Sequence, residues 1–185
     1  MTATLPAELA DFVANTSIPV TVAVPGEHDR VLVAANRPFC KLTGYDEPEI
    51  LGRDCRFLQG AATAPEARSA MRRFFNDPSQ TQTRIEVVNY RKDGLAFVNL
   101  VFLSKLKDLS GAVRFLFASQ FDVSHASPSS AEGYDRQLGA RMAELQMLGK
   151  MHQLSVGASL STLAASTHAI AAAKLALAEI EAHAS

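Results

Sequence analysis

The sequence predicts an α+β domain in which a five-stranded antiparallel sheet carries helices on one face. Three observations lead to this prediction. Runs rich in β-branched and aromatic residues come in the order strand, strand, a cluster of short helices, then three further strands. Turn-forming residues separate neighbouring runs. After Val123 the composition changes abruptly, first to small polar residues and then to two helical patterns.

The N-terminal part of the chain begins with a short amphipathic helix, expected at residues 6–14. It continues with two strands at 19–24 and 30–35, which a Pro-Gly turn separates. Between residues 36 and 58 the pattern is helical, but glycines and prolines interrupt it. Short helical pieces of this kind suit the wall of a ligand site better than a long core helix does.

The next part of the chain begins with a helix predicted at residues 64–76. Thr63 and Glu66 form a T-x-x-E pattern typical of a capping box, with a proline in the first turn. Three strands joined by glycine-containing turns complete the predicted sheet, at 81–91, 96–106 and 113–123.

The change in composition divides the chain into four parts. These are an N-terminal cap helix at 1–17, the α+β domain at 18–123, a linker at 124–133 and a helical extension at 134–185.

Two helices are expected in the extension, at 134–154 and 159–182. The second carries an apolar stripe made of Leu160, Leu163, Ile170 and Leu177. Helices this apolar need either a sheet face or another copy of themselves to pack against. A dimer-forming tail is the more economical interpretation.

The composition excludes several classes of protein. The 18 basic and 19 acidic residues nearly cancel, so the chain lacks the charge expected of a nucleic-acid-binding or membrane-surface protein. It shows no secretory signal and no run of about eighteen apolar residues. Two cysteines, Cys40 and Cys55, are no disulfide framework. We therefore expect a cytoplasmic protein with reduced thiols.

The segment at 52–60, with the sequence GRDCRFLQG, carries the chemistry. It places the Cys55 thiol beside Arg56, whose positive charge is expected to favour the thiolate and to attract an anion. A hydrophobic pair and the amide of Gln59 follow. This combination indicates either a nucleophile or a site that holds a phosphate-bearing cofactor.

This segment resembles the signature of LOV (light-oxygen-voltage) domains, a branch of the PAS superfamily, whose usual form is GRNCRFLQG. Eight of the nine positions match, and Asp54 stands where the family has asparagine. Further family motifs occur in order along the chain: NYRKDG at 89–94, FVNLVFL at 97–103 and FLFASQFDV at 115–123. The similarity covers residues 18–123 and implies the PAS/LOV fold.

The resemblance implies that an FMN is held non-covalently in the dark and that Cys55 forms a reversible covalent adduct with it under blue light. Gln120 would face the ring nitrogen that gains a proton and would relay the change, because an amide can both donate and accept. The short connection between Gln59 and Thr63 leaves no room for the adenine of FAD, so FMN is favoured over FAD.

The resemblance also assigns the cofactor contacts. Arg56 and Arg72 would clamp the phosphate, and Arg72 lies thirteen residues after Gln59, which is the family spacing. Asp54, beside the thiol, belongs to the same site. The amides expected to bind the polar edge of the cofactor and its ribityl chain are those of Gln59, Asn89, Asn99 and Gln120. The expected apolar lining consists of Phe39, Leu58, Val101, Leu103 and Leu116.

We therefore expect a photosensory signalling protein rather than an enzyme. Light would change a homodimer formed by the C-terminal helices, or the binding of an unidentified effector. Neither a nucleic acid nor a membrane is an expected partner. Three alternatives stay open: the sensor fragment of a light-regulated histidine kinase, a flavin redox sensor, and a PAS interaction module without a cofactor.

Other residues receive simpler interpretations. Cys40 follows Phe39 in a helical piece and is expected to act as a small hydrophobic residue. Arg73 is expected on a solvated helix face. The five histidines are scattered along the chain and are expected to form neither a metal site nor a phosphoacceptor site.

Overall fold

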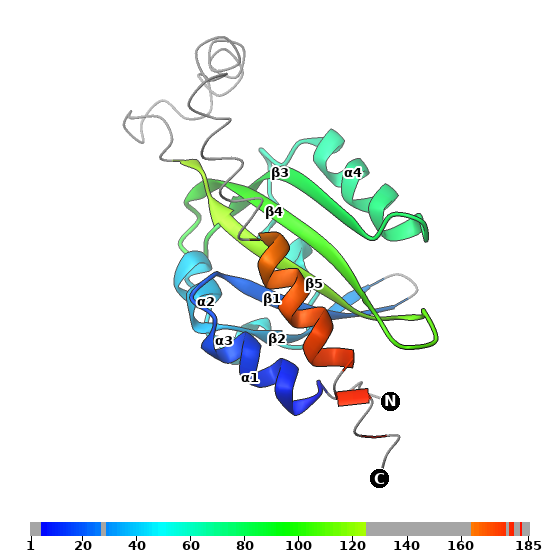
Figure 1. The fold of residues 1–185 in the computed structure, drawn as a ribbon. Helices are drawn as coiled ribbons and strands as arrows, with labels where there is room; N and C mark the ends of the chain where they lie inside the picture. The colour runs from blue at the N-terminus through cyan, green and yellow to red at the C-terminus, as the bar shows by residue number, and fades with distance from the viewer. Residues whose placement is uncertain (1–4, 27–28, 125–163, 177, 180–181, 183–185) are drawn as a thin grey trace, which may run out of the picture.

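The sheet has five strands in the order β2-β1-β5-β4-β3, and all neighbouring strands are antiparallel (Figure 1). The computed structural model describes residues 5–26, 29–124, 164–176, 178–179 and 182. The strands are β1 (Val20–Pro25), β2 (Arg30–Ala35), β3 (Gln82–Tyr90), β4 (Ala96–Lys107) and β5 (Val113–Asp122). Both the predicted class and the predicted strand positions are confirmed, and the order places the first and last strands side by side.

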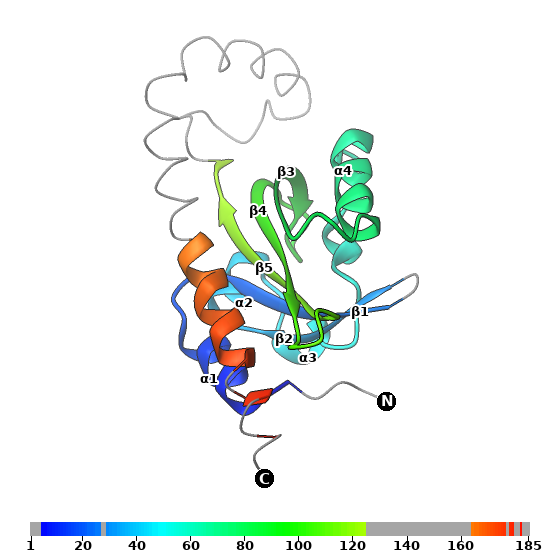
Figure 2. The same ribbon diagram turned by 45° about the vertical axis from the view of Figure 1, so that its right-hand side comes forward.

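Helices cover both faces of this sheet. The described helical elements are α1 (Ala7–Asn15), α2 (Arg37–Thr43), α3 (Glu47–Ile50), η1 (Cys55–Leu58), α4 (Pro65–Asn76) and a C-terminal helix at 164–176. The short elements α2, α3 and η1 lie with α4 on one face, which we call the inner face. Helix α1 and the C-terminal helix lie on the outer face, where Figure 2 shows them side by side.

The break between β2 and α2 depends on one buried amide, that of Asn36. Its Oδ1 atom accepts hydrogen bonds from the backbone nitrogens of Phe39, at 3.1 Å, and Val20, at 3.0 Å. The first bond caps α2, and the second holds the start of β1 beside it. Gly44 ends the helix in the left-handed region, with φ of 77°, which favours glycine. These local signals explain why the helical segment is short.

A cluster of buried apolar side chains covers the outer face. Val20 and Val22 of β1 and Phe115 and Phe117 of β5 pack with residues of α1, β4 and the C-terminal helix. The helix residues buried in this cluster are Leu9, Val13, Ala171 and Leu175. Burial of one such leucine stabilises the fold by about 1.5–3 kcal/mol, so the C-terminal helix is held by apolar contact.

The stripe predicted on the C-terminal helix is wrong where the structure tests it. Ile170 is 46% exposed, whereas Ala164, Thr167, Ala171 and Leu175 are buried. The helix therefore packs against the outer cluster through Ala171 and Leu175 instead. The other three residues of that stripe, the linker after Ser124 and the helix expected at 134–154 lie outside the described residues.

The capping box predicted for α4 is also wrong. The helix begins after Ala64, with no side-chain cap. The Thr63 hydroxyl instead donates to the Val88 carbonyl, at 2.6 Å, and accepts from Gly60 N, at 2.9 Å. Thr63 thus ties the loop before α4 to β3. None of the helices in the described ranges is long and apolar enough to cross a lipid bilayer.

Candidate functional site

A cavity of about 210 Å³ lies between the inner face of the sheet and the helices α2, η1 and α4. All thirteen residues that the sequence assigns to the site line this one cavity. They are Phe39, Asp54, Cys55, Arg56, Leu58, Gln59, Arg72, Asn89, Asn99, Val101, Leu103, Leu116 and Gln120. The structure therefore brings them together from six elements, while their binding of a cofactor stays a prediction.

Seven further residues line the cavity and were missed by sequence reasoning: Thr21, Ala23, Arg30, Arg68, Met71, Phe75 and Ala118. Three of them had a signal in the sequence. Thr21 and Ala23 alternate with the valines of β1, and side chains of alternate strand residues lie on opposite faces. Arg68 precedes Arg72 by four residues, one helical turn, so both lie on the same side of α4.

A second depression, of about 450 Å³, lies open on the surface of α4. Ser69, Arg72, Arg73, Asn76 and Asp77 line it. It is larger than the cavity, but it has no enclosing apolar wall and no titratable thiol. The enclosed cavity is therefore the candidate site, and only Arg72 borders both.

Cys55 is the first residue of η1 and retains part of its accessible surface, while lining the cavity. Burial, and after it the charge of Asp54, raise the pKa of its thiol to about 12, although a hydrogen bond with the Thr21 side chain acts in the opposite direction. At neutral pH the sulfur therefore carries its proton.

The expectation that Arg56 favours the thiolate is wrong. The Arg56 guanidinium pairs with the Asp54 carboxylate, with 3.0 Å between Nε and Oδ1, and also with Asp29. Two carboxylates thus neutralise the one cation beside the thiol. Asp54 also accepts from Arg30 N and Arg56 N, each at 2.9 Å, so its carboxylate caps η1 and joins it to β2.

Three buried amides form a polar wall. Asn99 Nδ2 donates to Asn89 Oδ1, at 2.9 Å, and Asn89 Nδ2 donates to the Leu58 carbonyl, at 3.3 Å. Gln120 Nε2 donates to Thr21 Oγ1, at 3.2 Å, and to the Ala118 carbonyl, at 3.1 Å. Within the described part of the chain, Asn99 Oδ1 and Gln120 Oε1 have no hydrogen-bond partner.

Orphaned amide oxygens are a sign of a missing partner. A buried acceptor without a hydrogen bond costs about 1–3 kcal/mol, and such atoms are rare in native proteins. Here two of them belong to residues that line the same cavity. A ligand whose polar edge donates hydrogen bonds would satisfy both.

The remaining walls of the cavity are apolar on one side and basic on the other. The apolar side consists of five buried residues: Phe39, Leu58, Val101, Leu103 and Leu116. Arg68 and Arg72 reach the cavity from α4, and neither forms an ion pair with another residue of the described ranges. Arg30 lies over the Phe75 ring, 4.2 Å from its centroid. A planar ligand with an anionic end matches these walls.

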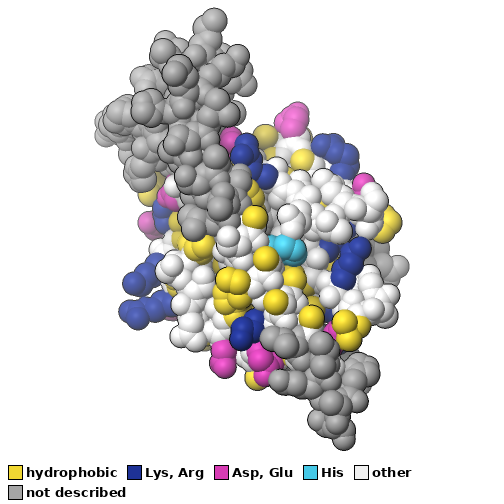
Figure 3. Space-filling view, viewed as in Figure 1, with side chains coloured by type: hydrophobic (Ala, Val, Ile, Leu, Met, Phe, Trp, Pro, Cys, Tyr) yellow, Lys and Arg dark blue, Asp and Glu magenta, His cyan; other side chains and the backbone are white. Residues whose placement is uncertain are grey.

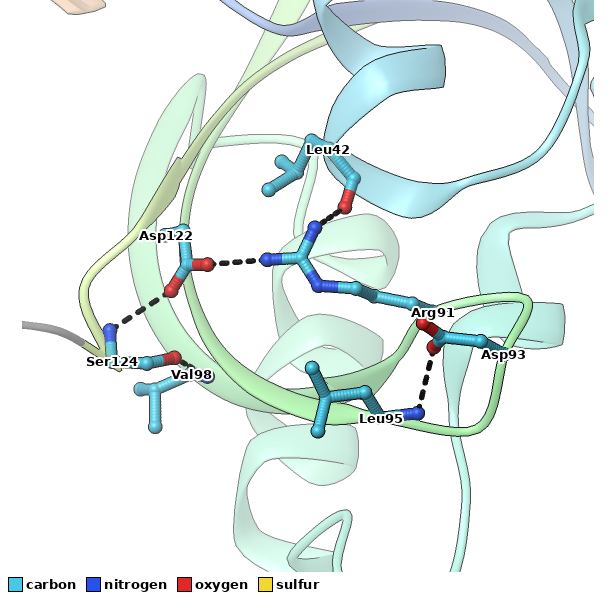
Figure 4. Close-up of polar contacts among 7 residues, drawn as sticks. All are labelled: Leu42, Arg91, Asp93, Leu95, Val98, Asp122 and Ser124. Carbon is cyan, nitrogen blue, oxygen red and sulfur yellow. Dashed lines mark hydrogen bonds and ion pairs between the residues drawn. The ribbon is translucent and has the colours of Figure 1, made fainter. Parts of the chain in front are cut away.

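A polar network surrounds the point where β5 leaves the sheet (Figure 4). Arg91, directly after β3, donates to the Asp122 carboxylate, at 2.6 Å, and to the Leu42 carbonyl of α2. Asp122 Oδ1 accepts from Ser124 N, at 2.9 Å, and Ser124 Oγ accepts from Val98 N, at 2.8 Å. Gln120 lies two residues before Asp122 on the same strand.

Cys40 does not line the cavity. Cys40 is half-buried and packs against the cluster of Phe39, Ile50 and Leu58, as expected of a small hydrophobic residue. Burial, and then the charges of Glu47 and Asp46, raise the pKa of its thiol. Among the residues that the structure describes, no group of three potential metal ligands is found.

An antiparallel sheet in this order, with short helices enclosing a cavity against one face, is the architecture of PAS sensor domains. The family model described as PAS domain matches residues 19–125. The blue-light-activated histidine kinase of Rhizobium johnstonii is 38% identical over 109 residues, which are 59% of this chain and 31% of the kinase. The chain thus spans less than a third of that relative's length.

Two solved structures are more specific. The LOV domain of a blue-light-activated histidine kinase from Erythrobacter litoralis is 30% identical, with a TM-score of 0.56, covering 60% of this chain and 99% of that one. A LOV domain whose mechanism was studied with a flavin analogue is 32% identical, with a TM-score of 0.55, covering 69% and 88%. The chain belongs to the PAS domain family and, within it, to the LOV domains.

Proposed function

We propose that this chain is a blue-light photoreceptor that holds FMN in the cavity and uses Cys55 to register light. One observation carries the proposal: a protonated thiol, two orphaned amide oxygens and an apolar wall all line a single cavity. The likeness to LOV domains, including one studied with a flavin analogue, supports the same ligand.

A bound flavin supplies absorption of blue light and, once excited, an electrophilic ring carbon next to a ring nitrogen that takes up a proton. Cys55 would supply the sulfur for a bond to that carbon and the proton for that nitrogen. A pKa raised to about 12 keeps this proton on the sulfur in the dark. Because the thiol brings both the electron pair and the proton, no further oxidant or reductant is needed. Reversal in the dark restores the thiol.

The polar wall and the basic wall would bind different ends of the cofactor. Asn89, Asn99 and Gln120 would bind the polar edge of the ring, with Gln59 beside them. Arg72 would bind the phosphate, and Arg68, one turn away, adds a second charge that Arg56 supplies less well because two carboxylates pair with it. The segment between Gln59 and Thr63 is tied to β3, where Ala62 N donates to Tyr90 Oη, at 2.9 Å. This closed loop favours FMN over FAD.

We propose that the light signal leaves the site along β5. The amide oxygen of Gln120 would accept a hydrogen bond from the newly protonated ring nitrogen. This would change the position of β5 and with it the hydrogen bonds of Asp122 and Ser124. That network lies where the proposed linker at 124–133 begins. The chain is proposed to act as a signalling protein, not as an enzyme.

The proposed output is a light-dependent homodimer formed by the helical extension at 134–185. In the described part of this extension, Ile170 remains 46% exposed after the C-terminal helix has packed on the sheet. Hydrophobic side chains gather on and around this helix in Figure 3. Apolar surface left outside a docked helix is available to a second copy of the chain.

The test is an absorption spectrum of the full chain in darkness and under blue light. We expect a structured flavin band that bleaches and recovers in the dark. Cys55→Ala should keep the flavin and lose the reversible bleach entirely. Bleaching only with a chemical reductant would indicate a redox sensor, and a colourless protein would indicate a PAS module without cofactor.

A second candidate is the sensor part of a light-activated histidine kinase. The kinase relatives favour this candidate, because they share the domain. The kinase of Rhizobium johnstonii is more than three times as long as the 109 residues that match. The spectrum does not distinguish the two. A light-dependent change of mass of this chain in light scattering would show that the extension itself responds to light, which supports the photoreceptor proposal.

A further inference from the structure

We infer that Thr21 is a positioning residue. Its hydroxyl links Cys55 to Gln120 and holds the Gln120 amide with the amide oxygen toward the cavity. This inference rests on the proposed function and adds a residue that none of the predicted contacts includes. Thr21 lies on the first strand of the sheet, and Gln120 lies on the last.

The geometry of the strand pair places Thr21 at this point. Thr21 is paired with Ala118 across β1 and β5, and it is 2% exposed. Its neighbours Val20 and Val22 belong to the outer cluster, so the Thr21 side chain lies on the inner face. A hydroxyl buried in this position needs partners, and the Gln120 amide, 3.2 Å away, is one of them.

The same contacts fix which way the Gln120 amide is turned. The Ala118 carbonyl can only accept a hydrogen bond, so the amide atom 3.1 Å from it must be Nε2. Thr21 Oγ1 accepts the second Nε2 hydrogen. Both donor positions are then used inside the sheet, and Oε1 is left buried without a partner in the described ranges.

This orientation has a consequence for the light reaction. An amide that presents Oε1 to the cavity is ready to accept from a ring nitrogen that has just gained a proton. The dark ring nitrogen is an acceptor and would need the opposite face of the amide. The Thr21 contact therefore stabilises the light state relative to the dark state.

Thr21 also contacts the other reacting group. A hydroxyl has one proton and two lone pairs, so Oγ1 can accept from Gln120 and still donate. Its hydrogen bond with the Cys55 side chain uses that proton and lowers the pKa of the thiol. Sulfur is a weak acceptor, so the contact with the amide is the stronger of the two. Loss of the hydroxyl should therefore act mainly through Gln120.

The experiment compares Thr21→Val, which keeps the shape and removes the hydroxyl, with Thr21→Ser, which keeps the hydroxyl. Both are made in the full chain with its flavin. We expect Thr21→Val to recover in the dark roughly 2- to 10-fold faster than wild type, the effect of one neutral hydrogen bond. Thr21→Ser should recover within about twofold of wild type by the same measure.

A second readout needs no light reaction. The infrared S–H stretch of Cys55 in the dark protein reports the bond from Thr21. It should shift in Thr21→Val and stay at the wild-type position in Thr21→Ser. A role in packing alone would not move this band, because valine fills the same volume. If Thr21→Val does not retain the flavin, Thr21→Ala replaces it as a second variant without the hydroxyl. Its dark recovery and its S–H band are then compared with those of wild type in the same way.

The outcomes separate this inference from the proposed function. If wild type neither bleaches nor recovers, the proposed function fails, while the S–H comparison still tests the contact. If wild type recovers normally, the inference stands only when Thr21→Val both speeds recovery and shifts the band. Unchanged or slower recovery, or an unmoved band, overturns it.

Discussion

The two faces of the sheet are built from the same strands but serve opposite purposes. On β5, Phe115 and Phe117 pack into the outer cluster, whereas Gln120 lines the cavity. On β1, Val20 and Val22 belong to the outer cluster, and Thr21 to the cavity. The outer face is filled with apolar side chains and stabilises the fold. The inner face keeps unsatisfied amide oxygens, which cost stability and prepare a binding site.

The comparison predicts that the thiol of the inner face is inert to ordinary alkylation. A pKa raised to about 12 lies well above the ordinary ~8.5 of a cysteine. At pH 8 iodoacetamide should therefore label Cys55 on the order of 1,000-fold more slowly than free cysteine, because only the thiolate reacts. The rate should rise about tenfold per pH unit until the fold fails.

The alkylation is best followed in the dark in a Cys40→Ser background, which leaves one thiol. Labelling at the rate of free cysteine at pH 8 would mean that the cavity is open to bulk water. The distinction between a tightly packed outer face and a binding site on the inner face that excludes bulk water would then be wrong.

Removal of one buried aromatic side chain from the outer face should lower the stability strongly. Phe117 is 1% exposed, and Phe117→Ala should lower the free energy of unfolding by about 3–5 kcal/mol in urea titrations. Dark recovery should stay within about twofold of wild type, since Phe117 lies on the face opposite Cys55. Leu109→Ala, at a residue 64% exposed, is the matched control and should change stability by less than about 0.5 kcal/mol.

Within the outer face, docking of the C-terminal helix should depend on its buried residues and not on its exposed ones. Leu175 is buried and Ile170 is exposed on the same helix. Leu175→Ala should weaken docking of the helix by about 2–3 kcal/mol, whereas Ile170→Ala should have little effect. Hydrogen exchange of residues 164–176 measures this difference. Equal loss of protection in the two variants would mean that the helix is not held by the sheet.

The smallest expected effect is a pH dependence of that docking. Burial lowers the pKa of His168 below its ordinary value of 6.5, and its Nδ1 has no partner in the described ranges. The undocked helix therefore binds the proton more tightly than the docked helix does. Docking is at full strength above about pH 6.5 and weakens as the pH falls below it, by less than about 1 kcal/mol per pH unit.

Hydrogen exchange at pH 7.5 and 5.5 tests this expectation, with His168→Gln as the control. Protection of residues 164–176 should fall at pH 5.5 in wild type and should not fall in the variant beyond the intrinsic change of exchange rate. A greater protection at the lower pH would reverse the sign and place a carboxylate beside His168.

Sequence reasoning found the elements and the motif residues because both are local signals. It failed where a residue's partner lies far along the chain. Arg56 pairs not only with its neighbour Asp54 but also with Asp29, 27 residues away, and Thr63 is bound by Val88, 25 residues away. Neither distant partner can be read from the neighbourhood of the residue. Thr21 was missed because a threonine among valines is also typical of any strand.

The pairing of β1 with β5 also determines when this domain can form during synthesis. Thr21 and Gln120 are separated by 99 residues, so the centre of the sheet stays open until nearly the whole domain has left the ribosome. Until then β1 presents an unpaired edge, which invites association with other chains. Closing such long loops makes folding slow in comparison with a helical domain of similar size. A flavin that binds between these elements would favour the chain in which the last strand has already joined the first.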